Sequence, residues 1–123
     1  MSRLITQLRA QRQSWVDLAP GKRVQIIRPA ESQISEFLRT TGNGRSLVVE
    51  LAQVCKYTVG WDGITEADLL GAAVGACDPV PFDSELWAEV VADRSEWLNR
   101  VAIGLSESIT NYFNKKAEAE KNL

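Results

Sequence analysis

The sequence contains no histidine, and this absence removes several classes of functional site. Ser-His-Asp and Cys-His nucleophile systems, imidazole metal ligands and a histidine pH switch are all excluded. Carboxylates, lysine, tyrosine and cysteine remain, but none of them occurs at a spacing typical of a catalytic or metal site. The sequence therefore predicts a protein that is not an enzyme and that holds no cofactor and no metal.

Cysteine and long apolar runs are also scarce. Cys55 and Cys77 are the two cysteines of the chain, and they form no CxxC pair. Two such thiols are more typical of a reducing compartment than of a secreted disulfide scaffold. The first residues include no hydrophobic signal segment, and no stretch approaches the roughly 20 apolar residues of a membrane span. We therefore expect a cytoplasmic protein with no membrane partner.

The size and composition suit one folded domain. The chain has 123 residues, of which 45% are hydrophobic and 24% are charged. A compact protein of this mass exposes roughly 6,600 Å² of surface. We expect an amphipathic or flexible arm over residues 1–13, a single domain over residues 14–114 and a polar tail over residues 115–123.

Charge is nearly balanced overall but uneven along the chain. The net charge of −2 combines +5 over residues 1–60, −8 over residues 61–97 and +1 over the remainder. The main expectation is that the acidic middle segment folds against the basic N-terminal part and is neutralised there. The alternative is an acidic surface that binds a basic partner. No basic groove accompanies the tryptophans of the later segment, so we expect no nucleic-acid partner.

A β-hairpin is predicted over residues 14–28. Two runs that alternate apolar and polar residues flank Pro20-Gly21-Lys22, and Pro-Gly favours a turn. Trp15, Val24 and Ile26 are the candidates for the buried face. Because a two-stranded hairpin is marginal alone, it must pack on helices or gain further strands.

Helices are predicted after the hairpin. Ile34, Phe37 and Leu38 indicate a short helix that ends before Gly42, and the apolar spacing from Leu47 to Val59 indicates a buried helix. The valines of this second stretch leave a strand as the alternative. The expected fold class is α+β, a mainly helical single domain with a small N-terminal β-hairpin.

Capping patterns indicate where the later helices begin. Thr65 and Asp68 have the spacing of a capping box, and Asp83 can cap the next helix. Residues 93–96 repeat the cap pattern ahead of a longer helix, on which apolar residues recur every three or four positions as far as Phe113. These carboxylates are explained by caps and turns, which argues against a catalytic pair.

Three segments carry a resemblance to a known family. They are residues 15–29 of the hairpin, the pattern Val59-Gly60-Trp61-Asp62-Gly63-Ile64-Thr65, and residues 78–86 with the Lys/Glu-ended helical tail. In these segments the chain resembles small tail-morphogenesis proteins of tailed bacteriophages and prophages, in particular tail assembly chaperones. The resemblance implies a non-enzymatic protein that holds the tape measure protein during tail assembly in the cytoplasm of the bacterial host.

Partner contacts are expected at the outer strand of the hairpin and near the end of the last helix. An open strand can pair with another strand, and an exposed apolar helix face can bind a client. The same surface is expected to support self-association as a homo-oligomer. The predicted partner-binding residues are Trp15, Val24, Ile26, Trp61, Ile109, Tyr112 and Phe113.

Two alternatives remain open. One is a structural component of the tail or neck of the virion, which would stay in the mature particle. The other is a small acidic inhibitor or regulator of a host protein, which would use residues 61–97 as its binding surface.

Overall fold

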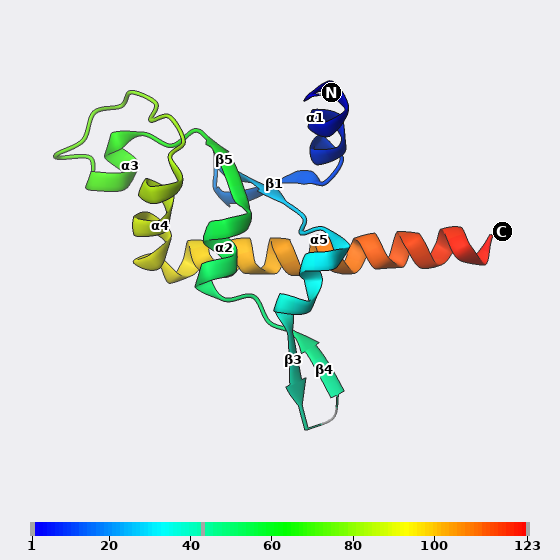
Figure 1. Ribbon diagram of the computed structural model, residues 1–123. Coiled ribbons are helices and arrows are strands. Elements are labelled where there is room, and N and C mark those ends of the chain that lie inside the picture. The colour runs from blue at the N-terminus through cyan, green and yellow to red at the C-terminus, as the bar shows by residue number, and fades with distance from the viewer. Residues whose placement is uncertain (1, 43, 123) are drawn as a thin grey trace.

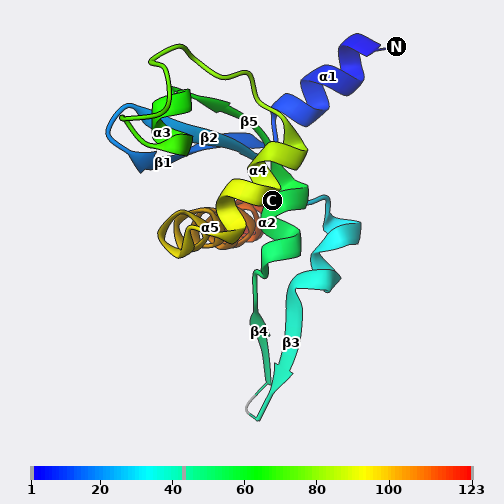
Figure 2. The ribbon, with the colours of Figure 1, turned by 90° about the vertical axis from the view of Figure 1, so that its left-hand side faces the viewer.

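A three-stranded antiparallel sheet lies on a long helix in the computed structural model of the protein (Figures 1 and 2). The structure describes residues 2–42 and 44–122. Helix α5 (Ser95–Lys121) runs beneath the sheet and contacts its first two strands. The strands are β1 (Gln13–Ala19), β2 (Lys22–Ile27) and β5 (Thr58–Asp62), in the order β1-β2-β5. The architecture is α+β, as predicted from the sequence.

The predicted hairpin is confirmed, but one of its side chains faces the other way. Val16 pairs with Val24, and Trp15 pairs with Gln25. Because successive side chains alternate between the faces of a strand, Val16 and Leu18 point to the core with Val24. Trp15 points to the opposite face and is 42% exposed. The prediction that Trp15 belongs to the buried face is therefore wrong.

Residues 58–62 form a strand, although helical spacing had predicted a helix that reaches Val59. Helix α2 (Leu51–Tyr57) stops at Tyr57, and the Thr58 hydroxyl donates to the carbonyl of Val54 at 2.7 Å. The chain then pairs antiparallel with β2, with Trp61 opposite Val24. This pairing gives hydrogen-bond partners to the backbone groups on the second edge of β2, and it adds the third strand that the hairpin needs for stability. The strand alternative is thus the one that forms over residues 58–62.

A second hairpin interrupts the region that was predicted to be wholly helical. The 3-10 helix η1 (Glu31–Phe37) leads directly into β3 (Leu38–Thr41), which pairs with β4 (Gly44–Leu47). The glycines at this point close a hairpin instead of ending a helix, because short glycine-containing loops join antiparallel strands. The hairpin projects from the body of the molecule (Figure 2).

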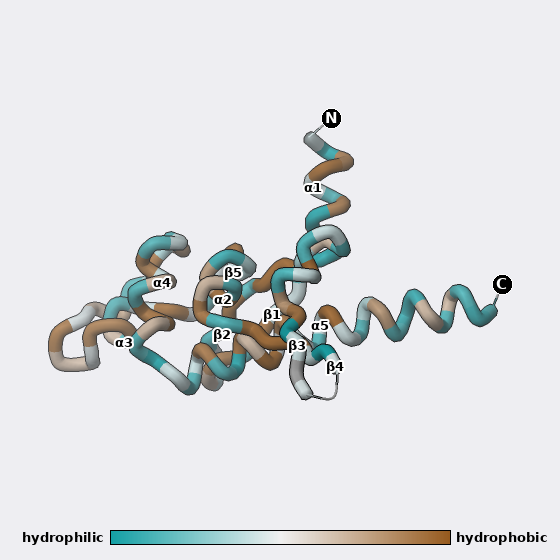
Figure 3. Tube along the Cα trace, turned by 60° about the horizontal axis from the view of Figure 1, so that its bottom comes forward, coloured by the Kyte–Doolittle hydropathy of each residue, from teal (hydrophilic) through white to brown (hydrophobic). Residues whose placement is uncertain are grey.

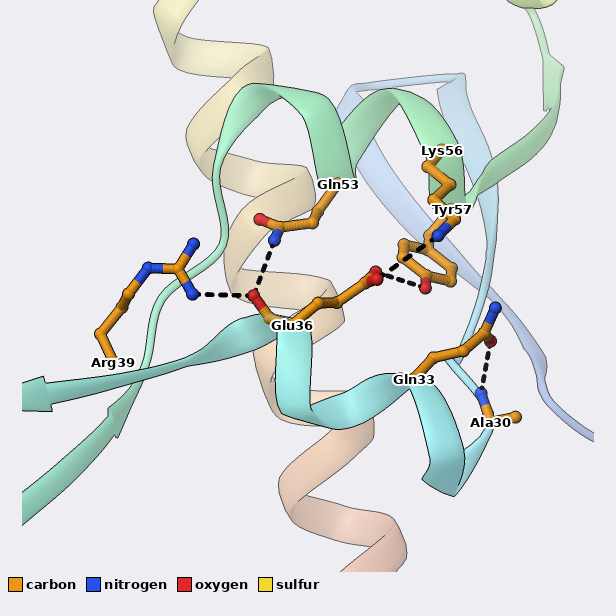
Figure 4. Close-up of polar contacts among 7 residues, drawn as sticks. All are labelled: Ala30, Gln33, Glu36, Arg39, Gln53, Lys56 and Tyr57. Atoms are coloured by element: carbon orange, nitrogen blue, oxygen red, sulfur yellow. Dashed lines mark hydrogen bonds and ion pairs between the residues drawn. The ribbon is translucent and has the colours of Figure 1, made fainter.

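The base of this second hairpin is held by contacts to Glu36 (Figure 4). The Tyr57 hydroxyl donates to the Glu36 carboxylate at 2.5 Å, and Lys56 Nζ lies 3.4 Å from it. The Glu36 carbonyl accepts from Gln53 Nε2 at 3.1 Å and from an Arg39 guanidinium nitrogen at 2.9 Å. Burial, reinforced by the hydrogen bond to Glu36, raises the pKa of Tyr57. These contacts join η1 to α2.

Two of the three predicted helix caps are present. Asp68 N donates to Thr65 Oγ1 at 3.2 Å, and Thr65 N donates to the Asp68 carboxylate at 2.8 Å, which completes the capping box of α3 (Glu66–Leu70). Asp83 Oδ1 accepts from two amides at the start of α4 (Ser84–Ala92). The expected cap at residues 93–96 is wrong, because α5 begins after Arg94 without a side-chain cap bond.

The core lies between the sheet, α2, α4 and α5. Trp87 and Val91 of α4 and Val101, Leu105 and Ile109 of α5 are buried in it. The total surface is 8174 Å², which exceeds the roughly 6,600 Å² of a compact chain. The excess reflects three projecting elements, α1 (Ser2–Ala10), the β3–β4 hairpin and the end of α5 (Figure 1). The residues predicted as a polar tail are helical as far as Lys121.

Candidate protein-binding groove along an open strand

Strand β1 has one neighbour, β2, and its other edge is open among the residues that the structure describes. Arg28 N donates to the carbonyl of Arg12 at 2.7 Å, so these two residues form a hydrogen-bonded pair. In an antiparallel ladder such pairs occur at every second residue. The backbone groups of Ser14 and Val16 are therefore directed at β2. Those of Gln13, Trp15 and Asp17 are directed at the open edge.

Helix α5 forms the floor of a groove along this edge. Gly104 lies against Val16, and a Cβ atom there would come within 2.5 Å of Val16 Cγ2. The glycine thus lets the helix approach the strand closely. Ile103 is 57% exposed in the groove. The groove is lined by Ser14, Trp15, Val16 and Asp17 of β1 and by Arg100, Ile103, Gly104, Glu107, Ser108 and Asn111 of α5.

Both signs of charge occur along the groove. Asp17 and Glu107 contribute carboxylates, and Arg100 contributes a guanidinium. At one end the groove continues past Arg12 to Lys115. A bound segment would therefore meet apolar surface at Ile103 and charged groups of both signs along the groove.

A polar cluster fixes α5 at the end of the groove. The Arg28 guanidinium lies 3.7 Å from the centre of the Tyr112 ring, and the Tyr112 hydroxyl donates to Glu31. Lys116 Nζ lies 3.0 Å from the same carboxylate. The hydrogen bond from Tyr112, followed by that from Lys116, lowers the pKa of Glu31, and the hydrogen bond to Glu31 raises the pKa of Tyr112. These contacts tie the segment after β2 to the helix.

Trp15 and Tyr112 are the predicted partner-binding residues that line this groove. The Arg23 guanidinium lies over the Trp15 ring, 4.0 Å from the ring centre. Phe113 is 40% exposed and contacts Tyr112, with 5.3 Å between the ring centres. The structure thus brings two predicted residues, Trp15 of the first strand and Tyr112 of the last helix, to the groove, and Phe113 contacts Tyr112.

The other four predicted residues lie elsewhere. Val24, Ile26 and Ile109 are buried in the core, where no partner can reach their side chains, so their prediction as contact residues is corrected. Trp61 packs against Phe82 and Trp87, and its Nε1 donates to the carbonyl of Val80 at 2.6 Å. Trp61 therefore anchors the segment before α4 and does not contribute to the groove.

The sequence reasoning missed Arg100, Ile103 and Glu107. A signal for them exists, because Ile103 is an apolar residue that falls outside the buried stripe of Val101, Leu105 and Ile109. An apolar residue out of phase with the core face of a helix marks a second, exposed apolar position.

The described residues provide no other evident site. Among residues 2–42 and 44–122, no three His, Cys, Asp and Glu side chains are grouped so that they could hold a metal ion. Within the same ranges no helix has the length and apolar character needed to span a bilayer. No family model matches the chain, and the searches of curated proteins and of solved structures likewise gave no match.

Proposed function

We propose that this protein is a non-enzymatic assembly factor of phage or prophage tail morphogenesis, of the tail assembly chaperone type. It acts in the cytoplasm of the bacterial host and binds the tape measure protein. The resemblance of the hairpin, the Trp61 segment and the residues before α4 supports the choice of system. The open edge of β1 beside Ile103 is the observation that supports binding as the activity.

The mode of binding is strand addition. An extended segment of the client pairs with the outward backbone groups of Gln13, Trp15 and Asp17 and continues the sheet by one strand. Every second side chain of the segment then points down toward α5, where an apolar side chain rests on Ile103. Main-chain bonds supply affinity without demanding one sequence, which suits a protein that holds a long client at several places.

Co-purification with the tape measure protein of the same phage or prophage tests this mode. Trp15→Pro removes an amide that points away from β2, so the hydrogen bonds between β1 and β2 are kept. The added strand of the client loses one hydrogen bond that this amide would donate to it. Trp15→Ala is the matched control, because it removes the same ring and retains the amide. We expect recovery with the client to fall at least fivefold more for Trp15→Pro than for Trp15→Ala.

Two further variants test the side-chain surface. Ile103→Glu places a charge where the apolar side chain of the client rests and should reduce recovery, whereas Ile103→Val should not. Tyr112→Ala with Phe113→Ala should reduce recovery because it removes half-buried Tyr112 at the end of the groove and the exposed Phe113 ring that contacts it. Unchanged recovery for Trp15→Pro, Ile103→Glu and the double variant would contradict the proposal. Presence of the protein in purified virions would favour a structural tail or neck component instead.

A further inference from the structure

Helix α1 exposes an apolar face that nothing in the described chain covers. None of its residues is buried, and Leu4 and Leu8 are 63% and 61% exposed. Ile5 lies beside them and is 41% exposed, so the three form one stripe at helical spacing. A helix of nine residues is marginal in water without packing. We therefore expect this apolar stripe to pack against another surface.

The same helix is purely basic. Arg3 and Arg9 are its charged residues, and the first carboxylate of the chain is Asp17. Helix α1 points away from the body of the molecule in both ribbon views and in the hydropathy-coloured trace (Figures 1, 2 and 3). Helix α1 ends at Ala10, and the hydrogen bond from Arg28 N to the Arg12 carbonyl attaches the chain to the sheet two residues later. This bond fixes the point at which α1 leaves the sheet.

Negative charge, opposite to that of α1, is found at the end of the molecule that carries α3, residues 71–83 and α4. We call this part the acidic end. Asp62 and Asp68 of the acidic segment pair with Arg23 and Lys22, and Glu96 pairs with Arg100. Within the described residues the remaining carboxylates are exposed and form no ion pair; they are Glu66, Asp78, Asp83, Glu85, Glu89 and Asp93. Internal neutralisation, the main expectation from the sequence, is thus confined to two residues.

Exposed apolar side chains accompany these carboxylates. Leu70 at the end of α3 is 60% exposed, and Val74 in the following connection is 76% exposed. The Arg94 guanidinium donates to the carbonyls of Asp68 and Leu69, which holds the end of α3 beside the junction of α4 and α5. The acidic end therefore offers apolar contact surrounded by negative charge, which is complementary to α1 in both respects.

We propose that α1 of one copy of this protein docks on the acidic end of a second copy. Leu4, Ile5 and Leu8 cover Leu70 and Val74, and Arg3 and Arg9 face the carboxylates of α3 and α4. The two surfaces are different parts of the chain, so the contact is head-to-tail and leaves an α1 and an acidic end unused at the ends of each assembly. Such a contact builds open chains when the rotation between successive copies does not close a ring, and open chains whose length grows with concentration are the form proposed here. This proposal is independent of the β1 groove.

Sedimentation velocity across a concentration series tests the contact with two variants. Leu4→Ser with Leu8→Ser alters α1 only, where no side chain is buried. Glu85→Lys with Glu89→Lys alters exposed positions of α4 that form no ion pair among the described residues. Each double variant should raise the dissociation constant of self-association about tenfold or more. Glu118→Lys with Glu120→Lys is the matched control for charge, and it should leave the constant unchanged.

Mixing the two double variants gives the decisive result. The α1 variant retains an intact acidic end, and the α4 variant retains an intact α1, so the mixture contains one functional contact per pair. We expect a 1:1 heterodimer and no larger species. Failure of the mixture to associate, a strictly monomeric wild-type protein, or loss of self-association in Trp15→Pro alone would overturn the proposal. Binding of wild-type protein, but not the α1 variant, to phosphatidylglycerol vesicles without self-association would assign α1 to a membrane surface instead.

Discussion

Gly104 of α5 and Val16 of β1 are in such close contact that a Cβ atom at residue 104 would lie 2.5 Å from Val16 Cγ2. This contact sets the distance between the long helix and the edge strand, and therefore the depth of the groove that we propose as the client site. A glycine within a helix costs roughly 1 kcal/mol relative to alanine, so its presence here is explained by packing.

Gly104→Ala tests this contact. The added methyl group should force Val16 or the helix to move, at a cost of about 1–3 kcal/mol that exceeds the gain in helix propensity. We expect a net loss in the free energy of urea unfolding. Adding Val16→Ala to the Gly104→Ala background should recover part of it. A more stable Gly104→Ala protein would show that the helix does not lie this close to the strand.

Thr65→Ala tests the capping box of α3. The change removes the Oγ1 acceptor of the Asp68 amide and should lower the free energy of unfolding by about 1 kcal/mol. Thr65→Ser keeps the hydroxyl and should be nearly neutral. Equal unfolding midpoints for the alanine and serine variants would mean that the side-chain cap contributes nothing.

The pH dependence of stability should report on Asp68. Burial raises the pKa of its carboxyl, but hydrogen bonds from Thr65 and Lys22 outweigh this effect, and the pKa is lowered. A lowered pKa in the folded state adds stability above the unfolded pKa of about 3.9, and this stability disappears as the pH falls through the folded-state pKa. The difference in unfolding free energy between wild type and Asp68→Asn should therefore be constant near neutral pH and shrink below about pH 4. If the difference in unfolding free energy between wild type and Asp68→Asn were the same at neutral and at acidic pH, the ionised Asp68 carboxylate would not contribute to stability.

The two thiols should react at different rates. Cys77 is exposed, whereas Cys55 is half-buried on α2 and burial raises the pKa of its thiol. Because the thiolate is the reactive form, a maleimide should modify Cys77 first in the native protein and Cys55 more slowly. Mass spectrometry of the digested protein after short labelling times measures the two rates. Faster labelling of Cys55 would place α2 outside the packed domain.

Local signals in the sequence predicted the elements that depend on local chemistry. Pro20 and Gly21 identified the first hairpin, and Gly21 adopts the positive φ of 77° that its turn requires. Thr65 and Asp83 identified the starts of two helices. These features involve residues a few positions apart, so their physical cause is visible in the sequence itself.

Elements that depend on distant partners were not predictable in the same way. Residues 58–62 become a strand because β2 offers them an edge, and no neighbour in the sequence encodes that pairing. The burial of Ile109 and the exposure of Trp15 depend on which face of the sheet meets α5. The groove likewise arises only when β1 and α5 lie side by side, so the candidate site was visible in the sequence as separate residues and not as a surface.

Amide hydrogen exchange in the client complex tests strand addition most directly. Protein labelled for NMR should be compared alone and with the bound tape measure segment, recovered from the co-purified complex by limited proteolysis. The amides of Ser14 and Val16 already face β2 and should change little, whereas those of Gln13, Trp15 and Asp17 should become protected on binding. Protection at alternate residues of β1 is the predicted result. Binding that leaves the Gln13, Trp15 and Asp17 amides exchanging as in the unbound protein would contradict the account.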